Sequence, residues 1–151
     1  GDRPRDRRAA ADLVDSMLAP LERLLREQQV AHDVGPFYDS RGLERRWGCT
    51  RQAVSKRRAQ GRLLGVPTDD GRVLYPTWQF VPGSDLRPVV LPGLPEVLAA
   101  LGEGFEGDLG RALWLCTPSP RLGGLPAYTH LNEHGPDVVL ALARSDAARR
   151  D

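Results

Sequence analysis

Several residue types on which whole classes of protein depend are scarce in this sequence. Only two cysteines occur in 151 residues, Cys49 and Cys116, and they form no CxxC pair. This argues against a disulfide scaffold or a zinc finger and suits a reducing compartment. No apolar run approaches the roughly 20 residues that span a bilayer, and the arginine-rich stretch 3–8 is not followed by the apolar core of a signal peptide. We therefore expect a cytoplasmic protein without a membrane partner.

Net charge is also nearly absent, because 21 basic residues face 20 acidic ones and leave +1. The basic residues are concentrated, however. Segment 41–62 holds eight of them against Glu44 alone, so it carries +7 and the remainder carries −6. Such a basic block is typical of a face that contacts DNA. The alternative interpretation is an exposed pair of arginine-rich helices without a DNA role.

The first part of the chain has the spacing of one long amphipathic helix. Between residues 9 and 29, apolar side chains such as Leu13, Met17 and Leu21 fall on one side. Pro20 is placed to kink or divide this helix, and residues 32–36 form a short connector. The apolar stripe needs a partner, either the rest of the fold or a second copy. We assign residues 1–36 to an N-terminal unit with a possible role in forming a homodimer.

Two short helices separated by a tight turn are predicted next. Ser40 is a good N-cap for a helix that carries Leu43 and Trp47, and Gly48 can end it in a left-handed conformation. Thr50 then caps a second helix that runs to about Gln60. The turn of about three residues between the two helices is the connection expected of a helix-turn-helix.

A hairpin is predicted after the second helix. Residues 63–66 and 73–75 have the composition of short strands, and Asp69-Asp70-Gly71 joins them through a strong turn signal. This hairpin is a candidate wing. We assign residues 37–81 to a winged helix-turn-helix DNA-binding unit.

The second helix has one side suited to reading duplex DNA. Ala53 and Val54 can pack on the first helix, which leaves Gln52, Ser55, Lys56 and Ala59 on the opposite face. Arginine can grip guanine and glutamine can grip adenine in the major groove, whereas flanking arginines position a helix on phosphates. The predicted DNA-binding residues are Thr50, Arg51, Gln52, Ser55, Lys56, Arg57, Arg58, Arg62 and Arg72.

The run from Thr50 to Gly61, followed by Arg62-Leu-Leu and by Gly71-Arg-Val-Leu-Tyr-Pro76, resembles short winged helix-turn-helix regulators of the excisionase and MerR-like kind. The resemblance implies binding to double-stranded DNA and a nucleoid-associated location.

Prolines and glycines crowd residues 82–93, so this segment is predicted to be a linker. Beyond it, residues 94–151 have the pattern of a helical unit with helices at 96–101, 109–115, 127–133 and 137–148. The predicted fold is therefore mainly α: a small winged helix-turn-helix with a two-stranded hairpin, joined to a C-terminal four-helix unit.

The run Trp114-Leu-Cys-Thr-Pro-Ser-Pro-Arg-Leu-Gly-Gly-Leu-Pro126 is the most distinctive of the chain. Its prolines forbid continuation of a helix and its paired glycines allow a tight reversal, so the residues alone indicate a structural corner between two helices.

The same run resembles the toxin-binding domain of Xre/MbcA/ParS-type antitoxins, over about residues 92–148. The resemblance implies a RES-domain toxin as partner, repression of the shared promoter by dimers, and a toxin-facing segment 137–151. The partner-binding residues that it implies are Trp114, Thr117, Pro118, Leu122, Arg149 and Arg150. One departure is that the family's usual DNA-binding domain is larger than the winged unit predicted here, so the resemblance does not extend to dimer geometry or operator spacing.

Two motifs suggest chemistry that the surrounding sequence does not support. His130-Leu-Asn-Glu-His134 spells the HxxEH of inverted zincins, but only 17 residues follow and Gly135-Pro136 ends the helix. Gly102 to Gly107 spells GxGxxG, but it follows a predicted helix and carries two glutamates that would repel a phosphate. Cys116 lies beside Trp114 as a small apolar residue. We predict no catalytic residue, no metal and no cofactor, and hence no enzyme.

Three hypotheses remain open at this point. The first is a type II antitoxin that neutralises a RES-type toxin and represses its own promoter. The second is a stand-alone or phage-type transcription regulator without a toxin partner. The third, and the weakest, is a metal hydrolase built on His130 and His134.

Overall fold

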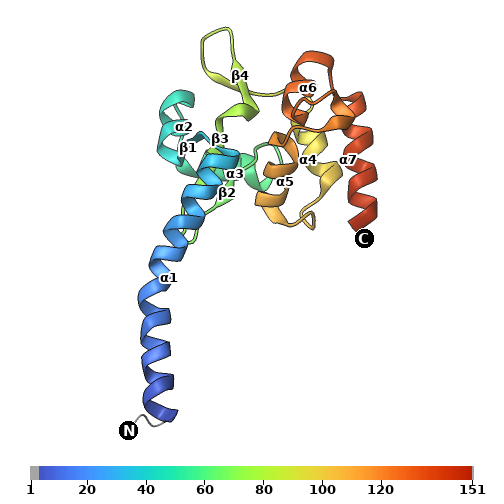
Figure 1. Cartoon of the computed structure of the whole chain (residues 1–151). Coiled ribbons are helices and arrows are strands. Elements are labelled where there is room, and N and C mark those ends of the chain that lie inside the picture. Colours follow the sequence, from blue (N-terminus) through green and yellow to red (C-terminus); the bar gives the residue numbers. More distant parts are fainter. Residues whose placement is uncertain (1–3, 151) are drawn as a thin grey trace.

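The computed structural model describes residues 4–150, within which the chain forms seven α-helices and five short β-strands (Figure 1). The predicted fold class is confirmed, because the protein is mainly α with a small antiparallel sheet beside a helix-turn-helix and a C-terminal helical unit. No helix among the described residues is both long enough and apolar enough to cross a membrane.

Helix α1 runs unbroken from Pro4 to Val34, so Pro20 does not divide it. Its last turn includes residues 32–34 of the predicted connector 32–36, so that only Gly35 and Pro36 join α1 to the next strand. The helix continues to Val34 because its end packs against the body of the protein. Val34 is buried, and its carbonyl oxygen accepts the indole N–H of Trp78 at 2.8 Å. The first turns project away from the body of the protein (Figure 1).

Helices α2 (Ser40–Trp47) and α3 (Arg51–Ala59) form the helix-turn-helix. The prediction that Ser40 caps α2 is wrong, because the Asp39 carboxylate accepts the backbone N–H of Gly42 at 2.7 Å and Ser40 is already helical. The Thr50 cap is confirmed, since its hydroxyl accepts the N–H of Ala53 at 3.2 Å. Gly48 is left-handed, as predicted, with φ of 61°.

A three-stranded antiparallel sheet of order β1-β3-β2 lies against these helices. It consists of β1 (Phe37–Tyr38), β2 (Val66–Pro67) and β3 (Val73–Pro76). The hairpin β2–β3 was predicted, but its first strand is shorter than 63–66 because Leu63 and Leu64 turn into the core instead. Strand β1 was not predicted, since two residues give no periodicity.

Segment 82–93 is not the linker that was predicted. After the 3-10 turn Thr77–Gln79, strands β4 (Phe80–Pro82) and β5 (Pro88–Val90) pair in antiparallel fashion. Pro82 stands opposite Pro88 at the end of this ladder. In a two-stranded ribbon each strand has a free edge, so a proline without an N–H is tolerated there.

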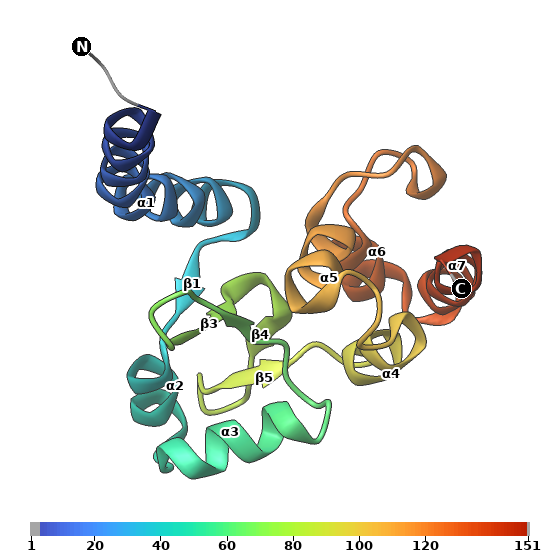
Figure 2. The same cartoon turned by 90° about the horizontal axis from the view of Figure 1, so that it is seen from below.

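Four helices follow at the predicted places and pack together beside the helix-turn-helix (Figure 2). They are α4 (Leu94–Leu101), α5 (Gly107–Cys116), α6 (Ala127–His134) and α7 (Asp137–Arg150). A 3-10 turn at Pro120–Leu122 lies inside the predicted corner between α5 and α6. Figure 2 also shows that α1 and α3 lie on opposite sides of the strands.

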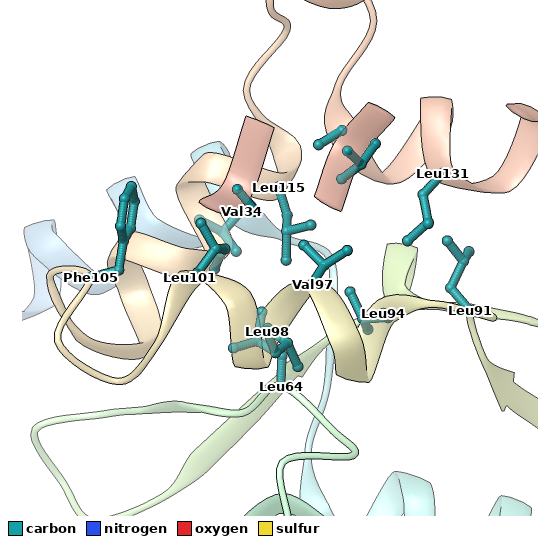
Figure 3. Packing of buried hydrophobic residues seen from close by; sticks show 14 of the residues in the cluster. Val34, Leu64, Leu91, Leu94, Val97, Leu98, Leu101, Phe105, Leu115 and Leu131 are labelled. Carbon is teal, nitrogen blue, oxygen red and sulfur yellow. The ribbon is translucent and has the colours of Figure 1, made fainter. Parts of the chain in front are cut away.

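The main core is shared between the two halves of the chain. Leu94, Val97 and Leu98 of α4 pack with Leu115 of α5, and Leu64 reaches the same cluster from the segment after α3 (Figure 3). A second, smaller core consists of Leu43, Val54, Leu63 and Tyr75. The helix-turn-helix and the helical unit are therefore joined by apolar packing.

One buried polar side chain fixes the exit from α3. The amide oxygen of Gln79 accepts the backbone N–H of Leu64 at 2.9 Å, and its amide nitrogen donates to the Leu64 carbonyl at 2.8 Å. Gln79 is fully buried, so both bonds are protected from water. This pair positions the chain between the helix-turn-helix and the main core.

Candidate nucleic-acid interface

Helix α3 is held on its inner side and open on its outer side. Val54 is fully buried in the small core, where it packs with Leu43 and Tyr75. Gln52, Ser55 and the other side chains that fall opposite Val54 are exposed. The predicted assignment of the two faces of α3 is therefore confirmed.

The outer face offers hydrogen-bonding groups at helical spacing. Arg51 begins the helix, and Gln52, Ser55, Lys56 and Ala59 follow along one side, all exposed. The two acidic residues of the nearby helix-turn-helix, Asp39 and Glu44, belong to α2 and its cap rather than to α3. Helix α3 therefore presents only cationic and neutral groups to a ligand.

One flank of α3 is built around Trp47. The Arg57 guanidinium stacks over the Trp47 ring at 4.3 Å, an arrangement that restricts the arginine without neutralising it. The Trp47 indole N–H donates to the Pro88 carbonyl at 2.7 Å and so attaches β5 to α2. Arg62 and Arg87 line the same groove as Arg57.

Arg87 was missed by the sequence analysis because it lies in the segment assigned to a linker. It is exposed, and its guanidinium pairs with Asp85 of the same hairpin at 3.3 Å. The β4–β5 hairpin thus adds a third arginine to the groove of Arg57 and Arg62. Arg87 could have been found only if residues 80–90 had been predicted to form a hairpin.

Arg58 occupies a different position from its neighbours. Its guanidinium donates to the Asp108 carboxylate of α5 at 3.0 Å, and Asp108 also pairs with Arg111 at 2.5 Å. Only 31 % of the Arg58 side chain is exposed. The structure therefore places Arg58 in an ion pair between α3 and the helical unit, whereas the sequence analysis predicted a phosphate contact.

Arg72 lies at the tip of the β2–β3 hairpin beside two carboxylates. Its guanidinium donates to Asp70 at 2.9 Å. The Thr68 hydroxyl, and to a lesser degree Arg72, hold the pKa of Asp70 below its usual value. Asp69 pairs with Arg26 of α1 at 3.5 Å. The predicted wing therefore carries a locally balanced charge, whereas the groove of Arg57, Arg62 and Arg87 has three arginines against Glu96 in its lining and Asp85, which pairs with Arg87.

The predicted partner-binding residues converge in a second place. Trp114, Thr117, Pro118, Leu122 and Arg150 line one cleft between α5, the corner and α7. Leu122 is almost entirely buried there, so it supports the corner. The Arg150 guanidinium stacks over the Phe105 ring at 4.3 Å and also pairs with Glu106. Arg149 does not line this cleft.

Asp146 of α7 holds the corner in place. Its carboxylate accepts the Trp114 indole N–H at 2.8 Å, two Arg121 N–H groups at 2.7 and 2.9 Å, and a bond from Arg149. The hydrogen bonds from Arg121 are the main reason that the pKa of Asp146 lies well below the ordinary carboxyl range, and the same contact raises the pKa of Arg121. Asp146 carries no sequence pattern that indicates this role.

The HxxEH histidines, Cys116 and the glycine-rich loop lie in three separate places, and the Nδ1 of His130 is buried without a hydrogen-bond partner among the described residues. The rings of His130 and His134 lie 4.6 Å apart, but no group of three or more His, Cys, Asp or Glu residues in the described chain is placed to hold a metal ion. Burial raises the pKa of the Cys116 thiol, which contacts the Asp33 carbonyl at 3.4 Å. The Gly102–Gly107 loop follows helix α4, as predicted.

No family model matches the chain, and no curated protein sequence matches it either. Among solved structures, the chain is similar to the one described as the NMR structure of Rv2175c, with 25% sequence identity and a TM-score of 0.61. The likeness covers 74% of this chain and 81% of that one. It therefore extends over most of both folds and beyond the helix-turn-helix alone.

Proposed function

We propose that this protein binds duplex DNA in a sequence-specific manner through the outer face of α3. The observation that carries the proposal is the capped helix α3, whose exposed side carries Arg51, Gln52, Ser55 and Lys56 and no carboxylate. A helix presented in this way fits the major groove, where base edges display their hydrogen-bonding groups.

The exposed residues divide into two roles. Arg51 and Gln52, in the first turn of α3, lie where recognition helices insert and can read guanine and adenine. Arg57, Arg62 and Arg87 share a groove at the flank, where charge alone is enough to hold a phosphate strand. Thr50 acts through its cap, which fixes the first turn of α3.

Two substitutions separate these roles. A preferred site is first selected from a random duplex library, and affinity is then measured for that site and for a scrambled one. We expect Arg51→Ala to cost about 1–3 kcal/mol on the selected site and little on the scrambled site. Arg62→Ala should weaken both about equally and reduce the slope of log affinity against log salt by about 1.

Arg144→Ala is the matched control, because Arg144 is exposed on α7 and carries the same charge. Equal effects of Arg51→Ala and Arg144→Ala on both duplexes would contradict the assignment of Arg51 to base reading. Affinity that does not change with any of the three substitutions would contradict DNA binding by α3.

We further propose that the protein is an antitoxin that represses its own promoter, with the cleft between α5 and α7 receiving a partner protein. The specific observation in favour is that five of the six residues implied by the family resemblance line this cleft. Arg149 and Arg150 are engaged with Asp146 and Glu106, so each would have to change partner to reach a toxin.

The partner proposal is tested with the product of the neighbouring gene. We expect a RES-domain protein encoded there to co-purify with the chain, and Thr117→Arg to abolish co-purification because the exposed Thr117 lines the cleft. Thr129→Arg on α6, outside the cleft lining, is the control. Absence of such a gene or of a complex would leave the stand-alone regulator as the better account.

A further inference from the structure

The projecting part of α1 carries an apolar stripe that no other described part of the chain covers. Every residue from Ala9 to Arg26 is exposed. Seven large apolar side chains in this stretch are each 42–71% exposed: Leu13, Val14, Met17, Leu18, Leu21, Leu24 and Leu25. Monomeric proteins seldom expose a contiguous apolar patch above a few hundred Å². The stripe therefore calls for a partner.

Most of the stripe points away from the body of the same molecule, whereas Leu24 also lines a small pocket with Asp69 and Asp70 of the β2–β3 hairpin. Val34 is buried in the main core and Val30 packs against it, so these residues mark the side of α1 that docks. Leu21 lies nine residues before Val30, which is two and a half helical turns and hence the opposite side of the helix. Closure of α1 onto its own protein would not cover Leu21.

Helix α1 has little stabilisation of its own along its projecting part. Most helix stability in proteins comes from tertiary packing of an amphipathic face, and this helix also contains Pro20 in its interior. Among the described residues, the tertiary contacts of α1 are concentrated in its last turns, through Val30, Val34 and the Arg26–Asp69 pair. Contacts along the stripe would stabilise the rest.

We infer that the partner is a second copy of this chain, whose α1 packs antiparallel to the first in a two-helix coiled coil centred near Ala19. Val14, Met17, Leu21 and Leu24 follow one another at alternating steps of three and four residues, which is the seam of a coiled coil. Reflection about residue 19 exchanges Val14 with Leu24 and Met17 with Leu21. Each large side chain of the seam thus meets another across the pair.

The area of the stripe agrees with this occupant. From the exposed fractions, the apolar area offered by each copy is on the order of 700 Å², against roughly 800 Å² per partner in a stable interface. Leu13, Leu18 and Leu25 flank the seam and would close its edges. Two copies packed along the stripe therefore approach the area of a standard interface.

The helix dipoles favour the antiparallel orientation, because the positive end of each helix then lies beside the negative end of the other. Asp12, Asp15, Arg23 and Arg26 lie on the outer side of the helix, away from the seam, and do not contribute to this preference. Nothing in this inference depends on DNA binding.

The first test is the molecular mass of the full chain in solution, measured by light scattering over a range of micromolar concentrations. We expect a dimer for the wild type and for Ala19→Glu, whose position is exposed on the outer side of α1. Leu21→Glu should weaken association at least about 100-fold, because the substitution changes both copies at the centre of the seam. Helix content of the folded body, followed by circular dichroism, checks that Leu21→Glu remains folded.

The second test fixes the orientation. Chains carrying Met17→Cys and chains carrying Leu21→Cys, both with Cys49 and Cys116 replaced by serine, are mixed and oxidised. The antiparallel pair predicts a disulfide between the two kinds of chain and little between identical ones. A monomeric wild type, a monomer that instead binds anionic phospholipid vesicles, or a dominant disulfide between two Met17→Cys chains would each overturn the inference.

Discussion

The helix-turn-helix and the C-terminal helical unit differ in how they use burial and charge. The helix-turn-helix has a core of four buried residues, whereas the main cluster, centred on α4, has sixteen. In the helix-turn-helix, the cations Arg51 and Lys56 are exposed. In the helical unit, Arg111 and Arg121 are paired with Asp108 and Asp146. One region leaves charge available for a ligand, and the other uses charge to hold itself together.

The smaller region depends on the larger one for its stability. Leu64 and Val66 leave the helix-turn-helix and pack in the main core, and Arg58 reaches across to Asp108. A core of four side chains is small for an independent domain. The comparison therefore predicts that the two regions unfold together, and that changes differ in effect according to the region in which they act.

The largest effect is expected for Leu64→Ala, which removes a side chain of the first region from the core of the second. Leu64 is almost completely buried, so the free energy of unfolding should fall by about 2–5 kcal/mol. Urea denaturation followed by tryptophan fluorescence and by far-UV circular dichroism measures it, and the two transitions should coincide. Leu86→Ala, at a side chain that is 85% exposed, is the control. Separate transitions would show that the two regions fold independently.

The next largest effect on stability is expected at Asp146, whose charge is paired within the helical unit. Asp146→Asn weakens the bonds to Trp114 and Arg121, and should lower stability by about 1–2 kcal/mol at neutral pH. The folded-state pKa of Asp146 lies below its unfolded value, so its contribution is complete above the ordinary carboxyl pKa and is lost as pH falls. Wild-type stability should therefore decline more steeply than that of Asp146→Asn below about pH 4. Parallel acid profiles would contradict this role.

Arg87→Ala tests whether the second hairpin belongs to the ligand-facing region. Arg87 shares its groove with Arg57 and Arg62, so duplex affinity at low salt should fall by a few-fold, about 0.5–1 kcal/mol, for any sequence. Stability should change by less than about 0.5 kcal/mol, because the side chain is exposed. Fluorescence anisotropy of labelled duplexes measures the affinity. No change in affinity would remove β4–β5 from the interface.

The smallest effect is expected at the wing. Asp70→Asn removes a carboxylate that faces Arg72 at the hairpin tip, which leaves Arg72 free for a phosphate. Affinity for duplex DNA should rise about two-fold at low salt and the gain should vanish as salt increases. A weaker complex would mean that the Asp70–Arg72 pair orders the wing for binding.

Helices and strands could be predicted where the apolar pattern was long or where capping and turn residues marked its ends. Thr50, Gly48 and Val54 all have the roles that their residue types favour. The segment 82–93 was assigned to a linker because its prolines exclude a helix and a central strand, whereas a two-stranded ribbon accepts proline at an edge. Short strands such as β1 leave no periodic signal at all.

Within the candidate site, exposure of the α3 face followed from helical spacing alone. The pairing of Arg58 with Asp108 could not be predicted, because the two residues are fifty positions apart and meet only through the shared core. The same holds for Asp146, whose partners Trp114 and Arg121 lie in α5 and in the corner that follows it. Contacts of this kind depend on tertiary structure and carry no local sequence signal.

The most direct test of the account is the affinity of the full chain for duplex DNA across a salt series, with Lys56→Glu compared against Arg144→Glu. Both substitutions reverse one exposed charge, on α3 and on α7 respectively. We predict that Lys56→Glu weakens binding at least about ten-fold at low salt, while Arg144→Glu changes it by less than about three-fold. Equal effects of the two reversals, or a wild-type chain that binds no duplex at low salt, would contradict binding through the outer face of α3.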